Sequence, residues 1–318
     1  MGGDRWRRPE AVRRVAVIGG GLIGSGWVAA FLASGRRVCV FDPDPEAPRK
    51  VQAHVERIRH DGAAPDADPD ALAFAGSIEE ALAEADFVQE NGPERAEAKT
   101  ALFEALDAAA PADIVIASST SSLAISDLTV GCAHPERFVL GHPFNPVHLM
   151  PLVETGGGKR TVEGAIDSAQ ALYAAMGKHP VRLRTEIFGH IANRLTSAMF
   201  REAVSLVADG VATVADVDAA IRYGPALKWA IQGQFATFHT SGGDAGLEGF
   251  LRHFAPGIVR RWATMSDPDL LDPELQAKLV AQTIESHAGR TVADIARDQD
   301  RRLADLLALL VPPPPAAR

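Results

Sequence analysis

Hydrophobic residues in the first part of the chain fall in short runs, and these runs alternate with amphipathic stretches. The runs, typical of buried parallel strands, cover residues 14–18, 37–41, 71–76, 86–89, 114–117, 138–140 and 181–183. The stretches with helical period cover residues 22–34, 46–60, 78–85, 94–109 and 162–176. Alternating strands and helices of these lengths predict a doubly wound, mostly parallel sheet.

The 94–109 helix is predicted to bury one apolar face. Spacing by three and four residues places five side chains on that face: Ala98, Ala101, Leu102, Ala105 and Leu106. After the next strand, residues 118–122 form a run of five hydroxyl residues, SSTSS. Hydroxyl groups at the carboxyl end of a strand lie where open α/β sheets bind ligands. The alternative is that one of them caps a helix over residues 123–128.

The pattern changes near residue 187, where helical segments become almost continuous. Breaks are expected at Gly224-Pro225, Gly242-Gly243 and Pro256-Gly257. The pattern therefore predicts an α/β domain over residues 1–185 and an all-α domain over residues 186–311. Four consecutive prolines then predict an extended, disordered tail over residues 312–318.

Composition narrows the classes of partner. The chain has 318 residues, of which 47% are hydrophobic, and a net charge of -9. That charge argues against a nucleic-acid partner, whose phosphates need a basic face. Residues 15–35 carry no charge, but their six glycines argue against a membrane helix. The two cysteines, Cys39 and Cys132, form neither a disulfide framework nor a metal motif, and a reducing, cytoplasmic setting is expected.

A glycine motif follows the first predicted strand and opens the first predicted helix. Gly19, Gly21 and Gly24 have the spacing G-x-G-x-x-G, which permits a tight turn, close approach of a pyrophosphate and close helix–strand packing. The expected cofactor-binding residues here are Gly19, Gly20, Gly21, Leu22, Ile23 and Gly24. Asp42 ends the second strand, where a carboxylate binds ribose hydroxyls and repels a 2′-phosphate. The motif predicts a Rossmann-type domain that binds NAD rather than NADP; a site for FAD or another nucleotide is the alternative.

The stretch GHPFNPVHLMPLVE, residues 141–154, holds a candidate acid–base pair. An imidazole held by a carboxylate moves protons near neutral pH, so His142 is the candidate base and Glu154 its partner. The alternative is a buried structural histidine in a proline-rich turn.

Several ordered motifs together resemble the 3-hydroxyacyl-CoA dehydrogenase superfamily. They are VIGGGLIGSGW, QENGPERAEAK, SSTSSL, GHPFNPVHLMPLVE and ANRL, between Val17 and Leu195. Downstream, REAVSLVADGVAT and IRYGPALKWAIQG resemble the branch that contains L-carnitine 3-dehydrogenase and L-gulonate 3-dehydrogenase, a lambda-crystallin.

The resemblance implies roles for individual residues. Ser121, His142, Glu154 and Asn193 match the catalytic serine, histidine, glutamate and asparagine of the family. Asp42, Glu94 and Lys99 match residues that contact NAD, and Asn145 is expected at the nicotinamide end of the site. The alternatives without a chemical role are a helix cap for Asn193, a solvated charge for Glu154 and a surface position for Lys99. A homodimer built through the helical domain is also implied.

The predicted reaction is NAD-dependent interconversion of a small 3-hydroxy acid and its 3-keto acid. Acyl-CoA members of the family carry a helical excursion after the second strand, and residues 42–86 look short for it. Ser119 and Pro143 depart from the acyl-CoA pattern. A short-chain 3-hydroxyacyl-CoA dehydrogenase, an L-gulonate 3-dehydrogenase and a non-catalytic crystallin-like protein are the alternatives.

The sequence contains two candidate elements for recognition of the substrate. One is an aromatic box for a quaternary ammonium group, formed by Phe144, Trp229, Phe235, Phe238 and Trp262. The alternative is that these aromatics are core residues. Arg222 or Lys228 is the candidate partner of a substrate carboxylate.

Overall fold

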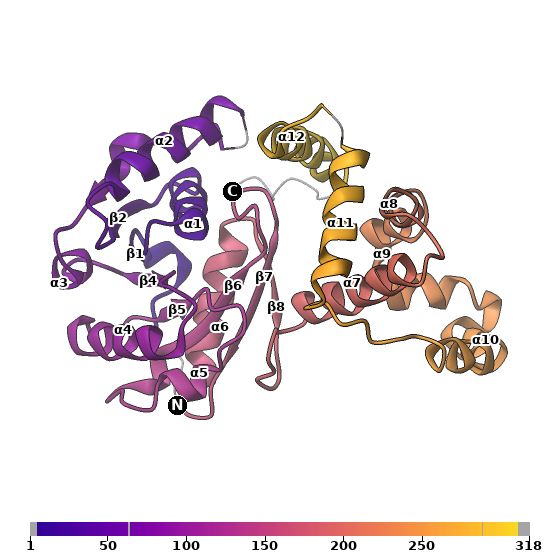
Figure 1. The fold of residues 1–318 in the computed structure, drawn as a ribbon. Helices are drawn as coiled ribbons and strands as arrows, with labels where there is room; N and C mark the ends of the chain where they lie inside the picture. The colour runs from indigo at the N-terminus through magenta and orange to yellow at the C-terminus, as the bar shows by residue number, and fades with distance from the viewer. Residues whose placement is uncertain (1–4, 63, 288, 311–318) are drawn as a thin grey trace. The chain divides into compact units, whose positions relative to one another are not determined.

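The computed structural model describes residues 5–62, 64–287 and 289–310 (Figure 1). The chain forms two compact units that divide between Asn193 and Arg194, and each unit is described by itself below. The predicted tail over residues 312–318 lies outside the described residues.

The first unit is built on one eight-stranded sheet with the order β3-β2-β1-β4-β5-β6-β7-β8. The strands are β1 (Arg14–Ile18), β2 (Arg37–Phe41), β3 (Leu72–Phe74), β4 (Phe87–Glu90), β5 (Ile116–Ser118), β6 (Phe138–Pro143), β7 (Leu152–Gly157) and β8 (His179–Arg182). All neighbouring pairs are parallel except β6 with β7. The predicted doubly wound, mostly parallel sheet is confirmed.

Helices cover both faces of this sheet (Figure 1). They are α1 (Leu22–Ala33), α2 (Ala47–His60), α3 (Ile78–Leu82), α4 (Ala96–Ala109), α5 (Ile125–Leu128) and α6 (Glu163–Ala175), with short 3-10 turns at η1 (Pro9–Ala11), η2 (Pro69–Ala71) and η3 (Pro135–Arg137). One core packs α1, α2 and α6 against the sheet, and the other packs α3, α4 and α5. In β1, Val15 and Val17 enter the first core, whereas Ala16 and Ile18 enter the second. This alternation is why a strand buried on both faces reads as an unbroken apolar run.

The antiparallel pair β6–β7 contains the stretch that holds the candidate acid–base pair. The register places His142 directly opposite Glu154. Side chains of directly opposite residues project from the same face of a sheet, about 5 Å apart at Cβ. The two residues therefore meet because they are ladder partners, and not because a turn brings them together.

The second unit contains only helices among its described residues. They are α7 (Ala192–Ala208), α8 (Val214–Tyr223), α9 (Pro225–Thr240), η4 (Gly243–Ala245), α10 (Gly246–Trp262), α11 (Pro273–Ser286) and α12 (Val292–Leu310). The predicted breaks at Gly224-Pro225 and Gly242-Gly243 are confirmed, but the break at Pro256 is wrong because Pro256 lies inside α10. Within the described residues of both units, no helix has the combination of length and apolar character needed to cross a membrane.

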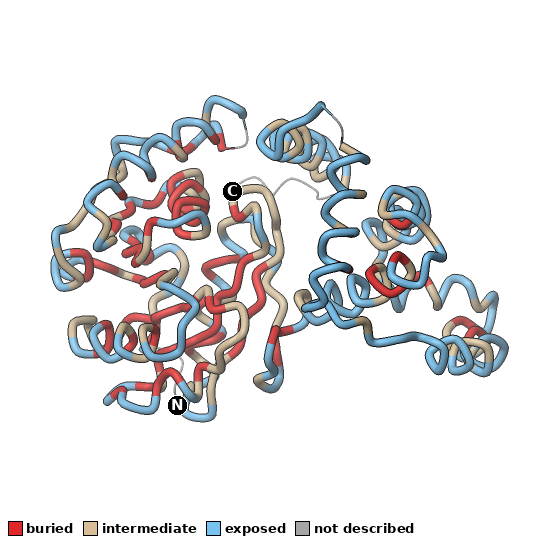
Figure 2. Tube along the Cα trace, in the orientation of Figure 1, coloured by how far each residue is buried: buried red, intermediate tan, exposed pale blue. Residues whose placement is uncertain are grey.

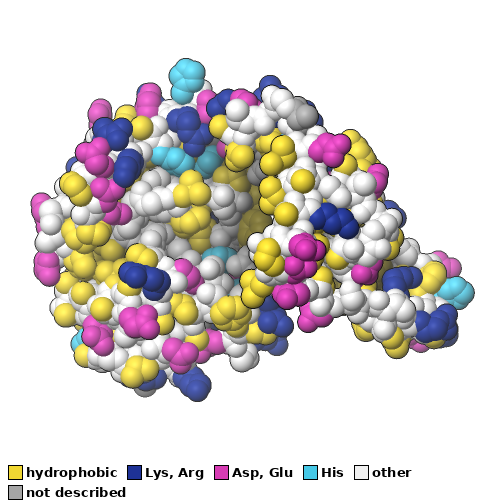
Figure 3. All heavy atoms as spheres, viewed as in Figure 1, with side chains coloured by type: hydrophobic (Ala, Val, Ile, Leu, Met, Phe, Trp, Pro, Cys, Tyr) yellow, Lys and Arg dark blue, Asp and Glu magenta, His cyan; other side chains and the backbone are white. Residues whose placement is uncertain are grey.

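Burial differs between the two units. Buried positions, red in Figure 2, fill the strands and inner helices of the first unit, whereas the helices of the second are mostly exposed. No residue of α12 is buried. Large apolar side chains are exposed on this unit, including Phe235 at 78% and Leu309 at 84%, and hydrophobic side chains reach its surface in Figure 3.

The predicted buried face of α4 is right at Leu106 but wrong at Ala101 and Ala105. The buried face of α4 is formed by Lys99, Phe103, Leu106 and Asp107, and Ala101 and Ala105 are exposed. Phe103 stacks on Phe138 of β6 at 4.9 Å between ring centroids, and that large contact sets the rotation of the helix. The alternative reading of the hydroxyl run, in which it caps the next helix, is wrong, because α5 begins after Ala124 without a side-chain cap.

Candidate active site

A cavity of about 440 Å³ opens within the first unit at the carboxyl ends of its strands. Its lining residues come from the end of β6, from the loops after β4, β5 and β6, and from helices α1, α4 and α7: Ile23, Asn91, Gly92, Glu94, Lys99, Ser119, Ser121, His142, Pro143, Phe144, Asn145 and Asn193. Half of the predicted site residues therefore line one cavity: Ile23, Glu94, Lys99, Ser121, His142, Asn145 and Asn193. Open α/β sheets bind ligands at this edge.

The glycine turn has the shape that a dinucleotide requires. A Cβ on Gly19 would stand 2.6 Å from the backbone oxygen of Asn91, and one on Gly24 would stand 1.8 Å from the oxygen of Gly19. Gly21 is different, because a Cβ there would meet nothing within 4 Å. Packing within the chain thus requires Gly19 and Gly24, whereas Gly21 leaves open space at the start of α1, where helix N–H groups favour an anion. The turn fits the pyrophosphate of NAD.

Asp42 faces this turn from the end of β2. Its Oδ2 accepts the N–H of Gly20 at 2.6 Å, and its Oδ1 accepts the N–H of Asp44 at 2.8 Å. The carboxylate is therefore fixed in direction beside the glycine turn. A fixed negative charge here suits ribose hydroxyls and repels a 2′-phosphate.

The pair His142 and Glu154 is buried and hydrogen-bonded. Nδ1 of His142 lies 2.8 Å from Oε2 of Glu154, and the two residues are 7% and 1% exposed. Burial raises the pKa of Glu154, but the hydrogen bonds from His142 and from the N–H groups of Ala192 and Ile191 outweigh it and leave the pKa below its ordinary value. An ionised carboxylate only accepts hydrogen bonds, so Nδ1 carries the proton and Nε2 of His142 has the free lone pair.

The second oxygen of Glu154 binds the start of α7. Oε1 accepts the N–H of Ile191 at 2.7 Å and the N–H of Ala192 at 2.9 Å. Reading Glu154 as a solvated charge is therefore wrong. Asn193 is the next residue and lies inside the first turn of α7, so its reading as the helix cap is also wrong.

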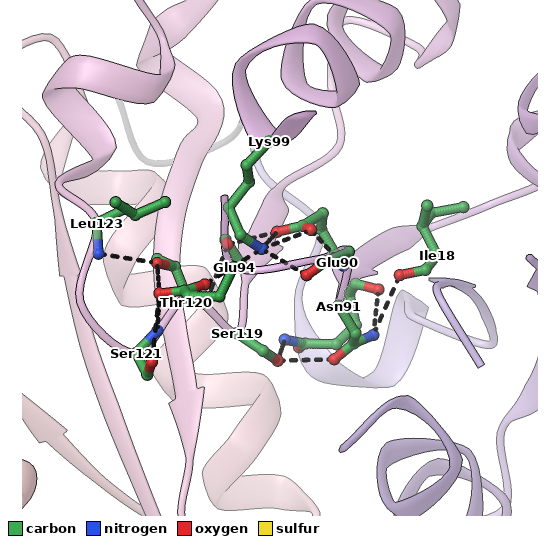
Figure 4. A network of polar contacts seen from close by, with 12 residues as sticks. Ile18, Glu90, Asn91, Glu94, Lys99, Ser119, Thr120, Ser121 and Leu123 are labelled. Atoms are coloured by element: carbon green, nitrogen blue, oxygen red, sulfur yellow. Dashed lines mark hydrogen bonds and ion pairs between the residues drawn. The ribbon is translucent and has the colours of Figure 1, made fainter. Parts of the chain in front are cut away.

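The hydroxyl run is held by a single carboxylate oxygen, as Figure 4 shows for Thr120 and Ser121. Oε1 of Glu94 accepts five hydrogen bonds between 2.8 and 3.2 Å, from the Thr120 hydroxyl and from the N–H and hydroxyl groups of Ser121 and Ser122. These donors and the charge of Lys99 lower the pKa of Glu94 although burial alone would raise it. The position of the Ser121 hydroxyl is thus set by Glu94.

Lys99 lies at the floor of the cavity and is 1% exposed, so the surface reading of this lysine is wrong. Its Nζ donates to both oxygens of Glu90, at 2.8 and 3.0 Å, and to the carbonyl of Gly92 at 3.1 Å (Figure 4). Glu90 is fully buried and also accepts the Ser118 hydroxyl at 2.5 Å. The ion pair therefore joins the end of β4 to α4, and the hydrogen bond from Ser118 joins the end of β4 to the end of β5.

Sequence reasoning missed Glu90. The available signal was a carboxylate inside the apolar strand Phe87–Glu90, because a buried carboxylate requires a cation beside it.

Ser119, noted only as a departure from the family pattern, accepts hydrogen bonds from the Trp27 indole and the Gln89 amide and donates to Asn91. No group of three or more metal-ligating side chains occurs within the described ranges.

The five aromatic residues considered for an aromatic box do not line one cavity in the described parts of either unit. Phe144 lines the cavity of the first unit, whereas Trp229 and Trp262 line a hollow of about 720 Å³ in the second. Phe238 stacks on Phe250 with ring centroids 4.3 Å apart, as a core residue does. Arg222 lies over the ring of its neighbour Tyr223 at 5.5 Å, and Lys228 is exposed.

Comparison with protein families covers both units. Residues 14–187 match the family profile described as 3-hydroxyacyl-CoA dehydrogenase, NAD binding domain. Residues 189–283 match the profile of the 3-hydroxyacyl-CoA dehydrogenase C-terminal domain.

Individual relatives extend this result. The chain is 45% identical to L-carnitine dehydrogenase of Streptomyces griseus over 303 residues, which cover 94% of this chain and 90% of the relative. It is 43% identical to L-carnitine dehydrogenase of Streptomyces coelicolor, with 94% and 95% covered. Among solved structures, 5-formyl-3-hydroxy-2-methylpyridine 4-carboxylic acid 5-dehydrogenase, an NAD⁺-dependent dismutase, matches with a TM-score of 0.78 at 28% identity, over 94% of this chain and 97% of that one.

Proposed function

Because the chain belongs to the 3-hydroxyacyl-CoA dehydrogenase family and is an NAD-dependent dehydrogenase of 3-hydroxy acids, we propose that its substrate is L-carnitine. The observation that carries the substrate is the likeness to L-carnitine dehydrogenases at 40–45% identity across 93–94% of the chain. The reaction removes a hydride from C3 and a proton from the 3-hydroxyl, leaving the 3-keto acid. NAD supplies the hydride acceptor when it is bound.

His142 is proposed as the general base. In the neutral ring Nδ1 holds the proton that is donated to Glu154, which leaves Nε2 as the acceptor, and His142 lines the cavity. Accepting the hydroxyl proton makes the ring an imidazolium, which the buried carboxylate of Glu154 stabilises. A base in this position contributes about 10²–10⁴-fold to the rate.

Ser121 and Asn193 are proposed to bind the substrate oxygen. Both line the same cavity as His142. The Asn193 amide can donate to this oxygen, and the Ser121 hydroxyl can do so by turning its one O–H away from Glu94. Such donors stabilise the negative charge that develops as the proton leaves. The glycine turn, Asp42, Asn145, Glu94 and Lys99 are proposed to form the NAD side of the site, with Lys99 acting through Glu90 and Gly92.

The segment between β2 and β4 of the first unit favours a free acid over a CoA ester as the substrate. Between β2 and β4 the described residues form α2, the short η2 and β3, and the five-residue α3. Several charged side chains of α2 form ion pairs with residues of the helix or of its preceding loop, such as Arg59 with Glu56 and Lys50 with Asp44. In its described residues this segment has no second long helix of the kind expected in a CoA-ester enzyme.

The substrate is tested by the rate of NADH formation with L-carnitine, L-gulonate, 3-hydroxybutyrate and 3-hydroxybutyryl-CoA at equal concentrations. We expect L-carnitine to have the highest kcat/KM. Activity confined to the CoA ester would overturn the substrate, and higher activity with L-gulonate would move the enzyme to the alternative within its branch. Binding of NAD without turnover of any of these acids, or of their keto acids with NADH, would favour the non-catalytic alternative.

A homodimer through the helical unit is also proposed. Five apolar side chains of the unit's described residues are buried: Val204, Val207, Val217, Phe250 and Leu275. Side chains such as Phe200, Val280 and Ile284 remain 52–67% exposed beside an apolar hollow of about 480 Å³. Exposed apolar surface of this extent marks an interface. Light scattering should give twice the chain mass of 33.7 kDa, and a monomer at micromolar concentration would contradict the proposal.

A cytoplasmic location is proposed from the chemistry of the chain. Both cysteines are free thiols, and burial raises the pKa of Cys132 to about 11, which keeps it protonated and unreactive. Reduced thiols and a requirement for NAD suit a reducing compartment. Cell fractionation with an antibody to the protein tests the location.

A further inference from the structure

His190 is a buried histidine in the turn between β8 and α7 that has no part in the reaction described above. It is 4% exposed. Its φ of 51° lies in the left-handed region, and the preceding Gly189 has a φ of 77°. A histidine rarely adopts this backbone conformation, which persists only where the surroundings hold it.

The side chain of His190 lies between two parts of the candidate site. Its Nε2 is 2.9 Å from the carbonyl oxygen of Thr120, the residue before Ser121. Its ring centroid is 5.1 Å from that of His142, at an interplanar angle of 57°. Because a carbonyl only accepts, Nε2 carries the proton and Nδ1 has the lone pair. Across the described chain no group hydrogen-bonds that buried Nδ1.

The backbone after His190 serves the same site. The left-handed turn directs the next two N–H groups, those of Ile191 and Ala192, to Oε1 of Glu154. The His190 side chain therefore contacts the Thr120 carbonyl and lies beside the His142 ring, and its left-handed backbone precedes the two N–H groups that bind Glu154. His190 does not line the main cavity; it borders a separate small cavity of about 20 Å³.

We propose that His190 is a positioning residue, which as a neutral imidazole holds the Thr120–Ser121 backbone and the His142 ring at a fixed separation. Ser121 must reach the substrate oxygen while Nε2 of His142 reaches its proton, so an error in their separation affects both contacts. A misplacement of about 1 Å costs about 10²-fold in rate.

The neutral state of His190 fits its surroundings. Burial lowers the pKa of His190, and the neighbouring His142 on β6 lowers it further. The hydrogen bond to Thr120 and the carboxylates of Glu154 on β7 and Glu94 after β4 act in the opposite direction but are outweighed. A neutral ring adds no repulsion when His142 becomes an imidazolium.

The test compares His190→Phe with His190→Gln. Phenylalanine keeps a ring of similar size but cannot donate to Thr120, whereas glutamine keeps a donor of similar reach. For His190→Phe we expect kcat to fall about 10–100-fold, with KM and the Kd for NAD within about twofold. We also expect a larger isotope effect on kcat with substrate deuterated at C3, because the chemical step becomes slower. His190→Gln should keep at least about fivefold more activity than His190→Phe.

A structural role alone would lower the melting temperature without separating these two variants or changing the isotope effect. Equal losses in His190→Phe and His190→Gln, or an unchanged kcat in His190→Phe, would overturn the proposal. If His190→Phe does not fold, His190→Asn replaces it, because asparagine tolerates the left-handed backbone but is too short to reach Thr120. Asparagine matching or exceeding glutamine in kcat would then overturn the proposal. His60→Phe, at a side chain 87% exposed, is the control.

The inference rests on the proposed role of His142 but not on L-carnitine, since any 3-hydroxy acid that the enzyme oxidises serves as the substrate. The two can fail separately. Full turnover in His142→Gln would remove the proposed base and with it the reason for positioning the ring, whereas an inactive His142→Gln with a fully active His190→Phe would remove only the role of His190.

Discussion

Glu154 uses its two carboxylate oxygens for different contacts. Oε2 holds Nδ1 of His142, and Oε1 holds two backbone N–H groups at the start of α7. With all of these donors the carboxylate stays ionised and cannot rotate without losing a bond. The orientation of the His142 ring and the start of α7, where Asn193 lies, are thus set by the same side chain.

We expect His142→Gln to lower kcat by about 10²–10⁴-fold, because an amide cannot accept the hydroxyl proton. Glutamine retains a polar group opposite Glu154, so the Kd for NAD, measured by fluorescence titration, should change by less than about threefold. His179→Gln, at an exposed histidine of β8, is the matched control. Near-normal turnover in His142→Gln would exclude His142 as the base.

At the scale of single elements, the glycines of the turn between β1 and α1 serve two different purposes: packing within the chain and access for the cofactor. Gly24 is required by the chain itself, since an added Cβ would overlap the Gly19 carbonyl, whereas Gly21 borders open space. Gly21 also has a φ of -64°, which alanine adopts without strain.

Gly24→Ala should therefore lower the free energy of unfolding by about 1–3 kcal/mol through overpacking. Gly21→Ala should leave stability within about 0.5 kcal/mol but raise the Kd for NAD about tenfold, equal to about 1.4 kcal/mol, because its methyl group occupies the approach of the pyrophosphate. Urea unfolding and NAD titration measure the two effects. Equal NAD affinity in Gly21→Ala and the wild type would contradict the proposed pyrophosphate site.

The junction of β4 and α4 depends on a buried ion pair. Lys99 and Glu90 are 1% and 0% exposed in their side chains. Lys99→Met leaves the carboxylate of Glu90 buried without its cation, and breaking a buried pair in this way costs about 3–5 kcal/mol of unfolding free energy. The double variant Lys99→Met, Glu90→Gln should regain part of the lost unfolding free energy, because it no longer buries an uncompensated charge.

The matched control for this pair is Lys50→Met. Lys50 pairs with Asp44 at the surface, where the side chains are 57% and 42% exposed, and such a pair is worth about 1 kcal/mol or less. Similar losses in Lys99→Met and Lys50→Met, measured by urea unfolding, would show that burial of the Lys99 pair has no energetic consequence.

At the scale of the whole molecule, the α/β unit carries most of the buried apolar residues, and its acid stability is expected to reflect a half-buried histidine. Burial, followed by His54, Lys178 and Arg57, lowers the pKa of His148 to about 4, and only Asp61 opposes this. In the unfolded chain a histidine has a pKa of about 6.5.

Between about pH 6.5 and 4 the unfolded chain therefore binds more protons at this position than the folded one, and unfolding becomes easier as the pH falls through this window. For a partly exposed side chain we expect a loss of about 1–2 kcal/mol. His148→Gln should flatten this part of the curve of unfolding free energy against pH. The exposed control His60→Gln should keep the wild-type slope, and a wild-type slope in His148→Gln would contradict the prediction.

Much of the architecture was predictable from the sequence because it depends on local periodicity. Apolar runs and helical spacing predicted the parallel sheet, the flanking helices and the all-α second part, and the glycine spacing with Asp42 predicted the dinucleotide site. The predictions that failed concerned which face of α4 is buried and whether the helix continues through Pro256. These depend on what an element packs against, which its own residues do not encode.

The sequence by itself determined which side chains are proposed to carry the chemistry: His142 and Glu154, the hydroxyl run, Asn193 and the glycine turn. Only the tertiary structure decided how they are held, because the holding groups lie far away along the chain. Glu94 binds Ser121 across 27 positions, Glu154 binds the N–H of Ile191 across 37, and His190 binds Thr120 across 70. Those contacts follow from the order of strands in the sheet, which cannot be predicted from any local pattern of residues.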